Sequence, residues 1–290
     1  MREMLEYFFV KFLIFLASIM PKSLVYKIFK FIALSLFRLD KRRRKLTIKN
    51  LTLSFVEKNE IEIESLAKQS YIELSKTVAE IILMINKQLD INSLVTNVDE
   101  AVERLNRYKS DDAKVYVTAH FSNWELLAQF MAVNGFALTG IGRRGNNALI
   151  EDNITTPFRQ MHGNRNIYKK NAIMQMIKVI KQNASLGLLI DQKAGHQNSV
   201  RTTFFGRDVM TTTSVAMLKL KYNPLLLSIF MTRDNNGRYK VIINEPIEYE
   251  PVGNKDEDIK NITQLCNDAV EDVVKAYPSQ WFWMHNRWKL

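Results

Sequence analysis

The sequence lacks several features on which whole classes of protein depend. It holds one cysteine, Cys266, which excludes a disulfide framework and a cysteine-rich zinc or iron–sulfur site. Four histidines, scattered over 290 residues, argue against a compact metal site built by the protein alone. Six prolines and ten glycines exclude a collagen-like or linker-rich chain. No apolar run reaches the roughly 20 residues of a straight membrane span.

Positive charge, by contrast, is abundant and unevenly spread. The net charge is +11, and residues 1–50 hold 12 Lys and Arg against 3 Asp and Glu, so +9 of it falls in the first sixth of the chain. Seven basic side chains stand within residues 38–49. Such a cluster can bind nucleic acid or anionic lipid, or remain solvated. With 47% hydrophobic and 24% charged residues, the chain has the composition of one large or two small globular domains.

The segments before this cluster are strongly apolar. Residues 7–20 (YFFVKFLIFLASIM) and 24–37 (LVYKIFKFIALSLF) contain lysines and are separated by Pro21. Two helices that lie in one leaflet fit this pattern, with the lysines reaching the headgroups and the polybasic stretch against anionic lipid on the cytoplasmic side. Buried helices of a soluble core remain the alternative. Nucleic-acid binding is disfavoured, because the aromatics precede the basic residues instead of alternating with them.

The rest of the chain predicts a helical scaffold followed by alternating strands and helices. Apolar residues recur at three- and four-residue intervals over residues 51–107, as in helices. An Asn-Gly pair within residues 233–238 predicts a hairpin into a strand over 239–243. The alternation indicates an α/β fold with a mixed sheet. The other elements are predicted, in chain order, over residues 114–119 (strand), 123–133 (helix), 136–141 (strand), 172–182 (helix), 186–190 (strand), 212–221 (helix) and 225–231 (strand).

The end of the first predicted strand carries the strongest candidate site. Chemistry in such sheets is found where a strand ends and a helix begins, and His120 and Glu125 stand there. A carboxylate brought across the turn would hold one imidazole nitrogen protonated and leave the other as a general base. Ser122 and Glu125 also have the spacing of a helix capping box, in which Glu125 only caps. The spacing by itself leaves both interpretations open.

Five segments carry a further likeness and follow one another along the chain: residues 120–125, 141–151, 188–195, 204–213 and 280–289. In this order they resemble the bacterial lipid A late acyltransferases, membrane-bound enzymes that add a secondary fatty acyl chain to the lipid anchor of lipopolysaccharide. Residues 120–125 (H-F-S-N-W-E) resemble the family's H-x-x-x-x-D/E signature. The likeness covers essentially the whole chain, although Ala148 replaces a usual proline and Asn286 a usual basic residue. The other similar segments are 141–151 (Y-R-x-x-x-N-P-L), 188–195 (D-x-x-x-G), 204–213 (F-F-G…T-x-T/S) and 280–289 (Q-W-x-W-x-H-R-R-W/F-K).

The resemblance implies a reaction and the residues that carry it. A fatty acyl group would move from an acyl-carrier-protein or acyl-CoA thioester to a hydroxyl of a lipid A precursor, with His120 as general base and Glu125 as the carboxylate that orients it. The family uses no metal or organic cofactor, so none is expected. Asp191 would orient an arginine or a sugar, or merely cap a turn, and the arginines would bind phosphates or an oxyanion. The substrate-binding positions of the family fall on Arg143, Asn147, Arg159 and Asp191.

The sequence therefore predicts a two-part chain. Residues 1–50 would form a hydrophobic, polybasic membrane anchor, and residues 51–290 an α/β acyltransferase domain with a mixed central sheet flanked by helices, as in glycerolipid acyltransferases. The expected location is the cytoplasmic face of the bacterial inner membrane, with membrane lipid, acyl carrier protein and a lipid A precursor as partners and no nucleic acid. Two alternatives remain: the same chemistry on a phospholipid, ornithine lipid or glycolipid, or a catalytically silent membrane scaffold.

Overall fold

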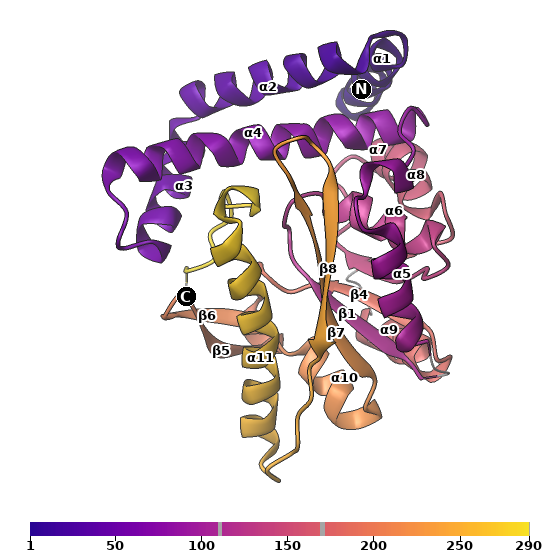
Figure 1. Cartoon of the computed structure of the whole chain (residues 1–290), viewed down its shortest axis with the longest axis vertical. Coiled ribbons are helices and arrows are strands. Elements are labelled where there is room, and N and C mark those ends of the chain that lie inside the picture. Colours follow the sequence, from indigo (N-terminus) through magenta and orange to yellow (C-terminus); the bar gives the residue numbers. More distant parts are fainter. Residues whose placement is uncertain (110–111, 169–171, 290) are drawn as a thin grey trace.

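A computed structural model of the protein describes residues 1–109, 112–168 and 172–289 (Figure 1). Its centre is a mixed sheet of six strands in the order β3-β2-β4-β1-β7-β8, and β5 and β6 form a separate antiparallel pair. The predicted α/β class with a mixed central sheet flanked by helices is confirmed. The strands are β1 (Lys114–Thr118), β2 (Thr139–Gly142), β3 (Arg165–Tyr168), β4 (Ser185–Leu189), β5 (Ser199–Phe204), β6 (Arg207–Thr212), β7 (Leu225–Arg233) and β8 (Tyr239–Pro246).

Helices cover both faces of the sheet because its central strands are apolar on both sides. Along β1, Val115 and Val117 pack into one hydrophobic cluster and Tyr116 into the other, as the alternation of a strand requires. The first cluster is closed by α9, α10 and α11, and the second by α5, α6 and α8. The helices are α1 (Arg2–Ile19), α2 (Lys22–Leu39), α3 (Lys41–Ser54), α4 (Glu60–Ile85), α5 (Val98–Arg107), α6 (Trp124–Val133), α7 (Ala148–Ile150), α8 (Thr156–Gln160), α9 (Ala172–Lys181), α10 (Ser214–Tyr222) and α11 (Lys255–Ala276).

Helix α4 lies across the end of the sheet toward which β7 runs (Figure 1). Asn59 begins it with a capping box, in which the Asn59 and Glu62 side chains each accept a backbone N–H of the other residue. Helices α1 and α2 pack on its far side through a small cluster that joins Ala17 and Val25 to Leu83. The N-terminal helices are thereby attached to the sheet through α4.

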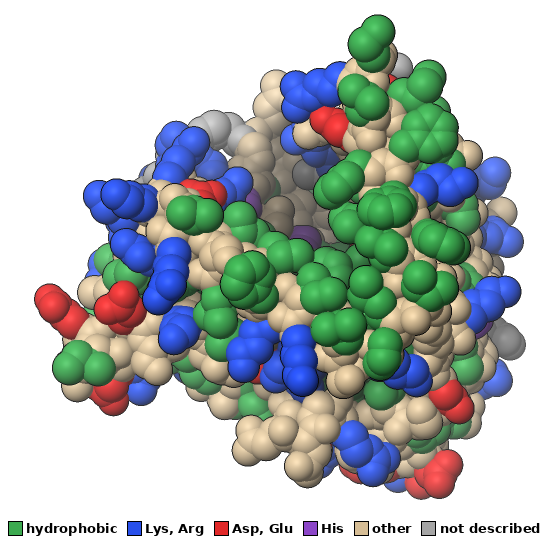
Figure 2. Space-filling model, turned by 90° about the horizontal axis from the view of Figure 1, so that it is seen from above, with side chains coloured by type: hydrophobic (Ala, Val, Ile, Leu, Met, Phe, Trp, Pro, Cys, Tyr) green, Lys and Arg blue, Asp and Glu red, His purple; other side chains and the backbone are tan. Residues whose placement is uncertain are grey.

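The outer faces of α1 and α2 are apolar and exposed. Figure 2 shows hydrophobic side chains gathered on this face, beside a hollow in the surface. Among the residues that the structure describes, no helix is both long and apolar enough to cross a bilayer. The exposed large side chains include Phe8, Phe9, Phe12, Phe15, Phe31, Ile32 and Leu36.

Helix α3 carries most of the polybasic stretch and also contacts the C-terminal tail, residues 277–289. The Nδ2 of Asn50, which is buried, donates to the backbone oxygens of Trp283 and His285, both at 2.8 Å. From the same helix, Arg43 donates to the backbone oxygen of Met284 at 3.0 Å. The basic helix and the last residues of the chain therefore hold each other in place.

Most of the predicted elements are found. The strands predicted over 114–119, 186–190 and 225–231 are β1, β4 and β7, and the predicted hairpin leads β7 into antiparallel β8. The helices predicted over 123–133, 172–182 and 212–221 are α6, α9 and α10. The strand predicted over 136–141 begins later, at Thr139, because the residues up to Phe136 still belong to the end of α6. The backbone N–H of Phe136 donates to the backbone oxygen of Met131, and Gly135 has the left-handed conformation of a helix end, with φ +87°.

Strands β3, β5 and β6 were not predicted from the sequence. The β5–β6 hairpin turns through Phe205 and Gly206, with φ +52° and +65°, the conformation of a two-residue turn of type I′. Phenylalanine is an unusual residue at such a position, which hides the turn from sequence patterns. The ring of Phe205 packs on Phe55 and Trp283, and these contacts compensate for the strained backbone.

Candidate active site

The carboxyl ends of two adjacent strands bring the main candidate residues together. Strand β1 pairs in parallel with β4, with Thr118 opposite Leu189, so the residues that follow each strand lie at the same edge of the sheet. His120 follows β1, and Asp191 follows β4. Beside them is a cavity of about 1110 Å³, which His120, Glu125, Arg143 and Arg159 all line.

The carboxylate that contacts the imidazole is Asp191. The Nδ1 of His120 lies 2.9 Å from Oδ1 of Asp191, and the other carboxylate oxygen accepts the backbone N–H of His120 at 3.0 Å and the indole N–H of Trp281 at 2.8 Å. Burial favours protonation of Asp191, but the neighbouring His120 and these hydrogen bonds outweigh it and hold the pKa of Asp191 below its ordinary value. An ionised Asp191 keeps the proton of a neutral imidazole on Nδ1 and leaves Nε2 as the acceptor.

Two sequence predictions about carboxylates are therefore corrected. Glu125 does not orient His120, since Asp191 occupies that place. Asp191, predicted to bind substrate, has a side chain only 2% exposed, contacts His120 and Trp281, and is absent from the cavity wall. The strand register explains both corrections: it places the end of β4 directly beside the end of β1, whereas the carboxylate of Glu125 extends from the first turn of α6 toward α8.

Glu125 forms a forked ion pair with Arg159 of α8. The Nε of Arg159 lies 3.0 and 3.2 Å from the two carboxylate oxygens, and a terminal nitrogen lies 2.6 Å from Oε1. Burial lowers the pKa of Arg159, but the charge and hydrogen bonds of Glu125 more than compensate, so the net shift is upward. With the Arg159 side chain one-third exposed, the pair presents a fixed positive group to the cavity.

The capping-box interpretation of this turn is wrong. Asn123, not Ser122, is the N-cap of α6, and its side chain accepts the N–H of Leu126 at 2.9 Å. Ser122 has φ +50°, a left-handed conformation that costs a non-glycine residue about 1–2 kcal/mol. The backbone N–H of Ser122 donates to the backbone oxygen of Gln280 at 2.6 Å, and the backbone oxygen of Ser122 accepts from the Thr77 hydroxyl at 2.9 Å. The strained turn is thus fixed by residues of α4 and of the C-terminal tail.

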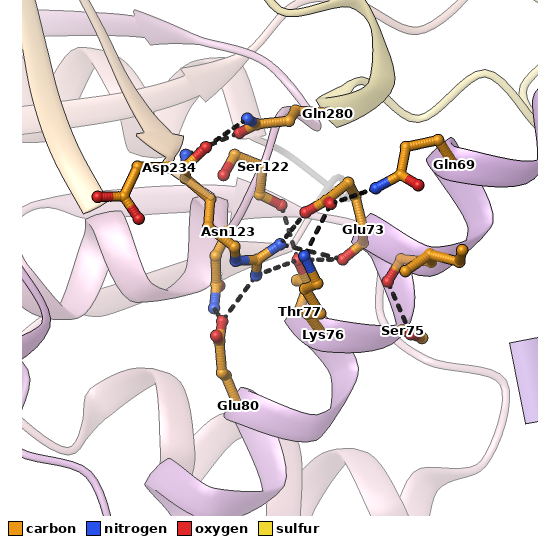
Figure 3. Close-up of polar contacts among 12 residues, drawn as sticks. Gln69, Glu73, Ser75, Lys76, Thr77, Glu80, Ser122, Asn123, Asp234 and Gln280 are labelled. Atoms are coloured by element: carbon orange, nitrogen blue, oxygen red, sulfur yellow. Dashed lines mark hydrogen bonds and ion pairs between the residues drawn. The ribbon is translucent and has the colours of Figure 1, made fainter. Parts of the chain in front are cut away.

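A buried charge network supports the same turn. Figure 3 shows Glu73, Thr77 and Glu80 on α4, directed toward the turn that carries Ser122 and Asn123. The guanidinium of Arg233 lies 2.7 Å from Glu73 and 2.8 Å from Glu80, and Glu80 also accepts the Asn123 amide at 2.7 Å. Because these charges are buried, each depends on its partners, and the network makes α4 part of the support of the site.

The remaining predicted residues lie in different places. Arg143 lines the cavity, is exposed, and donates to Asn146 at 3.0 Å. Asn147 is buried and outside the cavity wall: it caps α7 through the N–H groups of Leu149 and Ile150, and its amide donates to the backbone oxygen of Glu3 at 2.8 Å and to a Glu6 carboxylate oxygen at 3.0 Å. The structure therefore employs Asn147 to hold helix α1, and no substrate role is visible for it.

Residues near His120 were missed from the sequence. The side-chain nitrogen of Gln192 lies 3.4 Å from Nε2 of His120, and the ring of Trp124 meets the imidazole edge-on at 5.1 Å. In the sequence, only the position of Gln192 directly after Asp191, at the end of a predicted strand, pointed to a role in the site. Trp281, within the family-like segment 280–289, is buried and packs on Trp283 and Phe204.

The cavity combines apolar walls with this charged rim. Its wall includes two paired glycines of adjacent strands, Gly140 and Gly187. Gly140 leaves room close to the sheet, whereas the side chain of Leu138 occupies the space beside Gly187. Such a shape suits a long hydrocarbon chain with its reactive end at His120. The apolar side chains of the wall include Leu127, Met131, Leu138, Ile141, Leu188 and Ile229.

An α/β sheet that presents a histidine–aspartate pair to a large, mainly apolar cavity has the features of an enzyme that transfers acyl groups. The chain belongs to the bacterial lipid A biosynthesis acyltransferase family, whose model matches residues 1–290. It is also 22% identical over 274 residues to the lipid A biosynthesis lauroyltransferase of Escherichia coli (strain K12). The aligned residues cover 93% of this chain and 87% of that protein. The chain is therefore an acyltransferase of lipid A biosynthesis, and the predicted family and reaction class are confirmed.

Proposed function

We propose that the protein transfers a fatty acyl chain from an acyl-carrier-protein thioester to a hydroxyl of a lipid A precursor, at the cytoplasmic face of the inner membrane. The observation that carries this proposal is the His120–Asp191 pair at the wall of an apolar cavity, in a chain matched over its whole length by the family. The relative in Escherichia coli is named a lauroyltransferase, which supports a fatty acyl group as the transferred unit.

His120 acts as the general base of this reaction. The acceptor hydroxyl donates its proton to Nε2 as its oxygen attacks the thioester carbonyl. The carbon–sulfur bond then breaks, the new ester forms, and the proton passes from the imidazolium to the departing thiolate. Asp191 stabilises the imidazolium while it exists, as the carboxylate does in a serine hydrolase, with the acceptor alcohol in place of the serine. Neither Ser122 nor Cys266 has to carry an acyl group.

Positive groups at the cavity complete the proposed site. Glu125 keeps its place in the reaction indirectly, by holding the Arg159 guanidinium toward the cavity. Arg159 and Arg143 bind the phosphates of the acceptor or of the carrier's phosphopantetheine arm. The amide of Gln192, beside His120, is a donor for the oxyanion of the tetrahedral intermediate. No cofactor is needed for any of these steps.

The N-terminal helices attach the enzyme to the membrane in this proposal. The exposed apolar faces of α1 and α2 enter one leaflet, and the basic side chains of α3 contact anionic headgroups, each contributing about 1 kcal/mol. The hollow lies on the same side of the molecule as the apolar face (Figure 2), so a lipid acceptor reaches the site without leaving the membrane surface. Flotation with vesicles tests this: binding is expected with anionic lipid and is expected to weaken after Phe12→Ser and Phe31→Ser.

Acyl transfer from acyl carrier protein to a tetraacylated lipid A precursor is the direct test. The native protein is expected to form the ester. The rate of acyl transfer should fall by about 100-fold or more in His120→Ala, the order expected for removal of a general base. His162→Ala, which changes a histidine outside the cavity wall, is the matched control and should retain activity. Activity only on a phospholipid, ornithine lipid or glycolipid would keep the chemistry and change the acceptor. If the folded protein were inactive on every such lipid, the remaining interpretation would be a catalytically silent membrane scaffold.

A further inference from the structure

Arg287, near the end of the chain, is completely buried close to the proposed base. Its side chain donates to the backbone oxygens of Gln192 at 3.1 Å and Met210 at 3.0 Å. It also donates to Thr211 Oγ1 at 2.7 Å and Asn267 Oδ1 at 2.9 Å. One guanidinium therefore ties three parts of the fold together: the loop after β4, strand β6 and helix α11.

No carboxylate pairs directly with this cation among the described residues. The other fully buried guanidinium, that of Arg233, has ion pairs with Glu73 and Glu80. In contrast, the hydrogen-bond acceptors of Arg287 are two backbone oxygens, a hydroxyl and an amide oxygen, all neutral. Burial lowers the pKa of Arg287 to about 10, and the one charge that opposes this is Asp191. A buried cation without a contacting anion is costly, so its presence requires a compensating charge nearby.

The hydrogen bonds of Arg287 lead to the carboxylate that holds His120. Gln192, whose backbone oxygen it binds, directly follows Asp191. Met210, its second backbone partner, also accepts the N–H of Ala194, so the loop is attached to β6 on both sides of Lys193. The same C-terminal tail supplies Trp281, which donates to Asp191. Two residues of the tail therefore act on the Asp191 carboxylate. Trp281 contacts it directly, whereas Arg287 acts through the loop that carries Asp191 and through its own positive charge.

We propose that Arg287 is a positioning residue for the acyl transfer: it fixes the loop that carries Asp191 and Gln192, and its positive charge balances the Asp191 carboxylate behind His120. The inference rests on the proposed role of His120 as base. The charged and titratable groups around Arg287 are Asp191 and His285, with His120 and Arg43 beyond them. Without the cation, the unopposed Asp191 charge favours the imidazolium, so His120 would become protonated at a higher pH.

Two substitutions separate the two roles of Arg287. Arg287→Lys keeps the charge and loses the fork of donors, and Arg287→Gln loses the charge. Both are expected to lower kcat by about 10-fold or more, because a misplaced catalytic group is slow even when substrate binds normally. KM should stay within about two-fold. Arg207→Gln, which changes an exposed arginine of β6, is the matched control and should retain native kinetics.

Two further measurements show whether Arg287 acts through the base. The NMR titration of His120 is read without turnover; its midpoint should move to higher pH in Arg287→Gln and stay in place in Arg287→Lys. A double-mutant cycle with Asp191→Asn should be non-additive, since the double variant has no ionised Asp191 left to balance. Should Arg287→Gln fail to fold, Arg287→Lys still decides the positioning role by its kcat.

Three results would overturn the inference. They are native kcat in Arg287→Lys, an unmoved His120 titration in Arg287→Gln, and full additivity with Asp191→Asn, the last being the sign of a purely structural residue. Failure of the proposed function looks different. In that case the native protein transfers no acyl group, while the His120 titration still reports whether Arg287 and Asp191 are coupled to the imidazole.

Discussion

The indole nitrogen of Trp281 lies 2.8 Å from a carboxylate oxygen of Asp191, across 90 residues of sequence. The same oxygen accepts the backbone N–H of His120, so the carboxylate is held in place before it contacts the imidazole. A neutral indole contributes a hydrogen bond without adding charge. Asp191 is therefore oriented by a neutral donor at close range and, in the inference above, balanced by a cation further away.

Asp191→Asn should reduce kcat by about 100-fold to 10,000-fold, because an asparagine amide stabilises the wrong tautomer of His120 and cannot stabilise an imidazolium. Steady-state acyl transfer measures this. Asp258→Asn is a matched control, since Asp258 is also buried but accepts hydrogen bonds from Tyr249 and Val252, outside the site. Equal losses in the two variants would indicate a general effect on folding.

Glu125 and Arg159 should behave as one functional unit. Glu125→Gln removes the charge that fixes the guanidinium, and Arg159→Met removes the guanidinium itself. Each single change is expected to lower kcat/KM by about 10-fold or more, and the double change should cost no more than Arg159→Met alone. A double variant slower by the product of the two single losses would show that Glu125 acts independently of Arg159.

Removing Glu80 from the buried network should destabilise the fold strongly. Glu80→Gln leaves Arg233 with Glu73 as its single ion-pair partner, a change that costs about 3–5 kcal/mol in buried networks. Urea unfolding in detergent measures the loss. Glu103→Gln, which breaks an exposed pair with Arg107, is the control and should leave the unfolding midpoint unchanged. A stable Glu80→Gln variant would mean that the network carries little of the stability.

Gly140 should influence the length of the transferred chain. An added Cβ there would meet nothing closer than the backbone oxygen of Arg165 at 3.9 Å, so Gly140→Val fills cavity space without a clash at Cβ. Each methylene that no longer fits costs about 0.8 kcal/mol, or roughly four-fold in kcat/KM, and the preference should move to shorter chains. Competition between thioesters of different length measures it, and an unchanged profile would place the chain elsewhere. At Gly187 a Cβ would lie 2.9 Å from Leu138, so Gly187→Val should mainly destabilise the protein.

Cys266 should be inert in the folded enzyme. Burial raises the pKa of its thiol to about 12, compared with an ordinary value of 9.0, so the reactive thiolate is scarce below that pH while the protein is folded. Iodoacetamide at pH 8 is expected to label the cysteine only in urea, as mass spectrometry would show. Cys266→Ala should retain acyl transfer. Rapid labelling of the native protein would contradict the buried position.

The sequence predicted the frame of the molecule because that frame depends on local patterns. Apolar runs of the right length gave β1, β4 and β7, and an Asn-Gly pair gave the hairpin into β8. His120 could be identified since it directly follows an unmistakable strand. Phe205 shows the limit: its turn conformation is stabilised by packing against residues distant in sequence, which no local pattern contains.

The partner of His120 depended on information outside any local segment. Asp191 is 71 residues away, and only the pairing of β1 with β4 brings it to the imidazole. Glu125, five residues away, was the nearer candidate in sequence, but the turn through Ser122 and the start of α6 direct it to Arg159. A sequence motif can therefore identify functional residues, but it does not show which of their side chains are in contact.

The two hydrogen bonds from Asn50 to the C-terminal tail bear on how the enzyme is prepared for study. A shortened chain that starts at residue 51 would discard the apolar helices, but it would also remove the donor that holds Trp283 and His285. The freed tail is the segment that carries Trp281 and Arg287. Such a fragment would differ from the intact protein in its catalytic support as well as in its solubility, and a low turnover measured on it would say little about the need for a membrane.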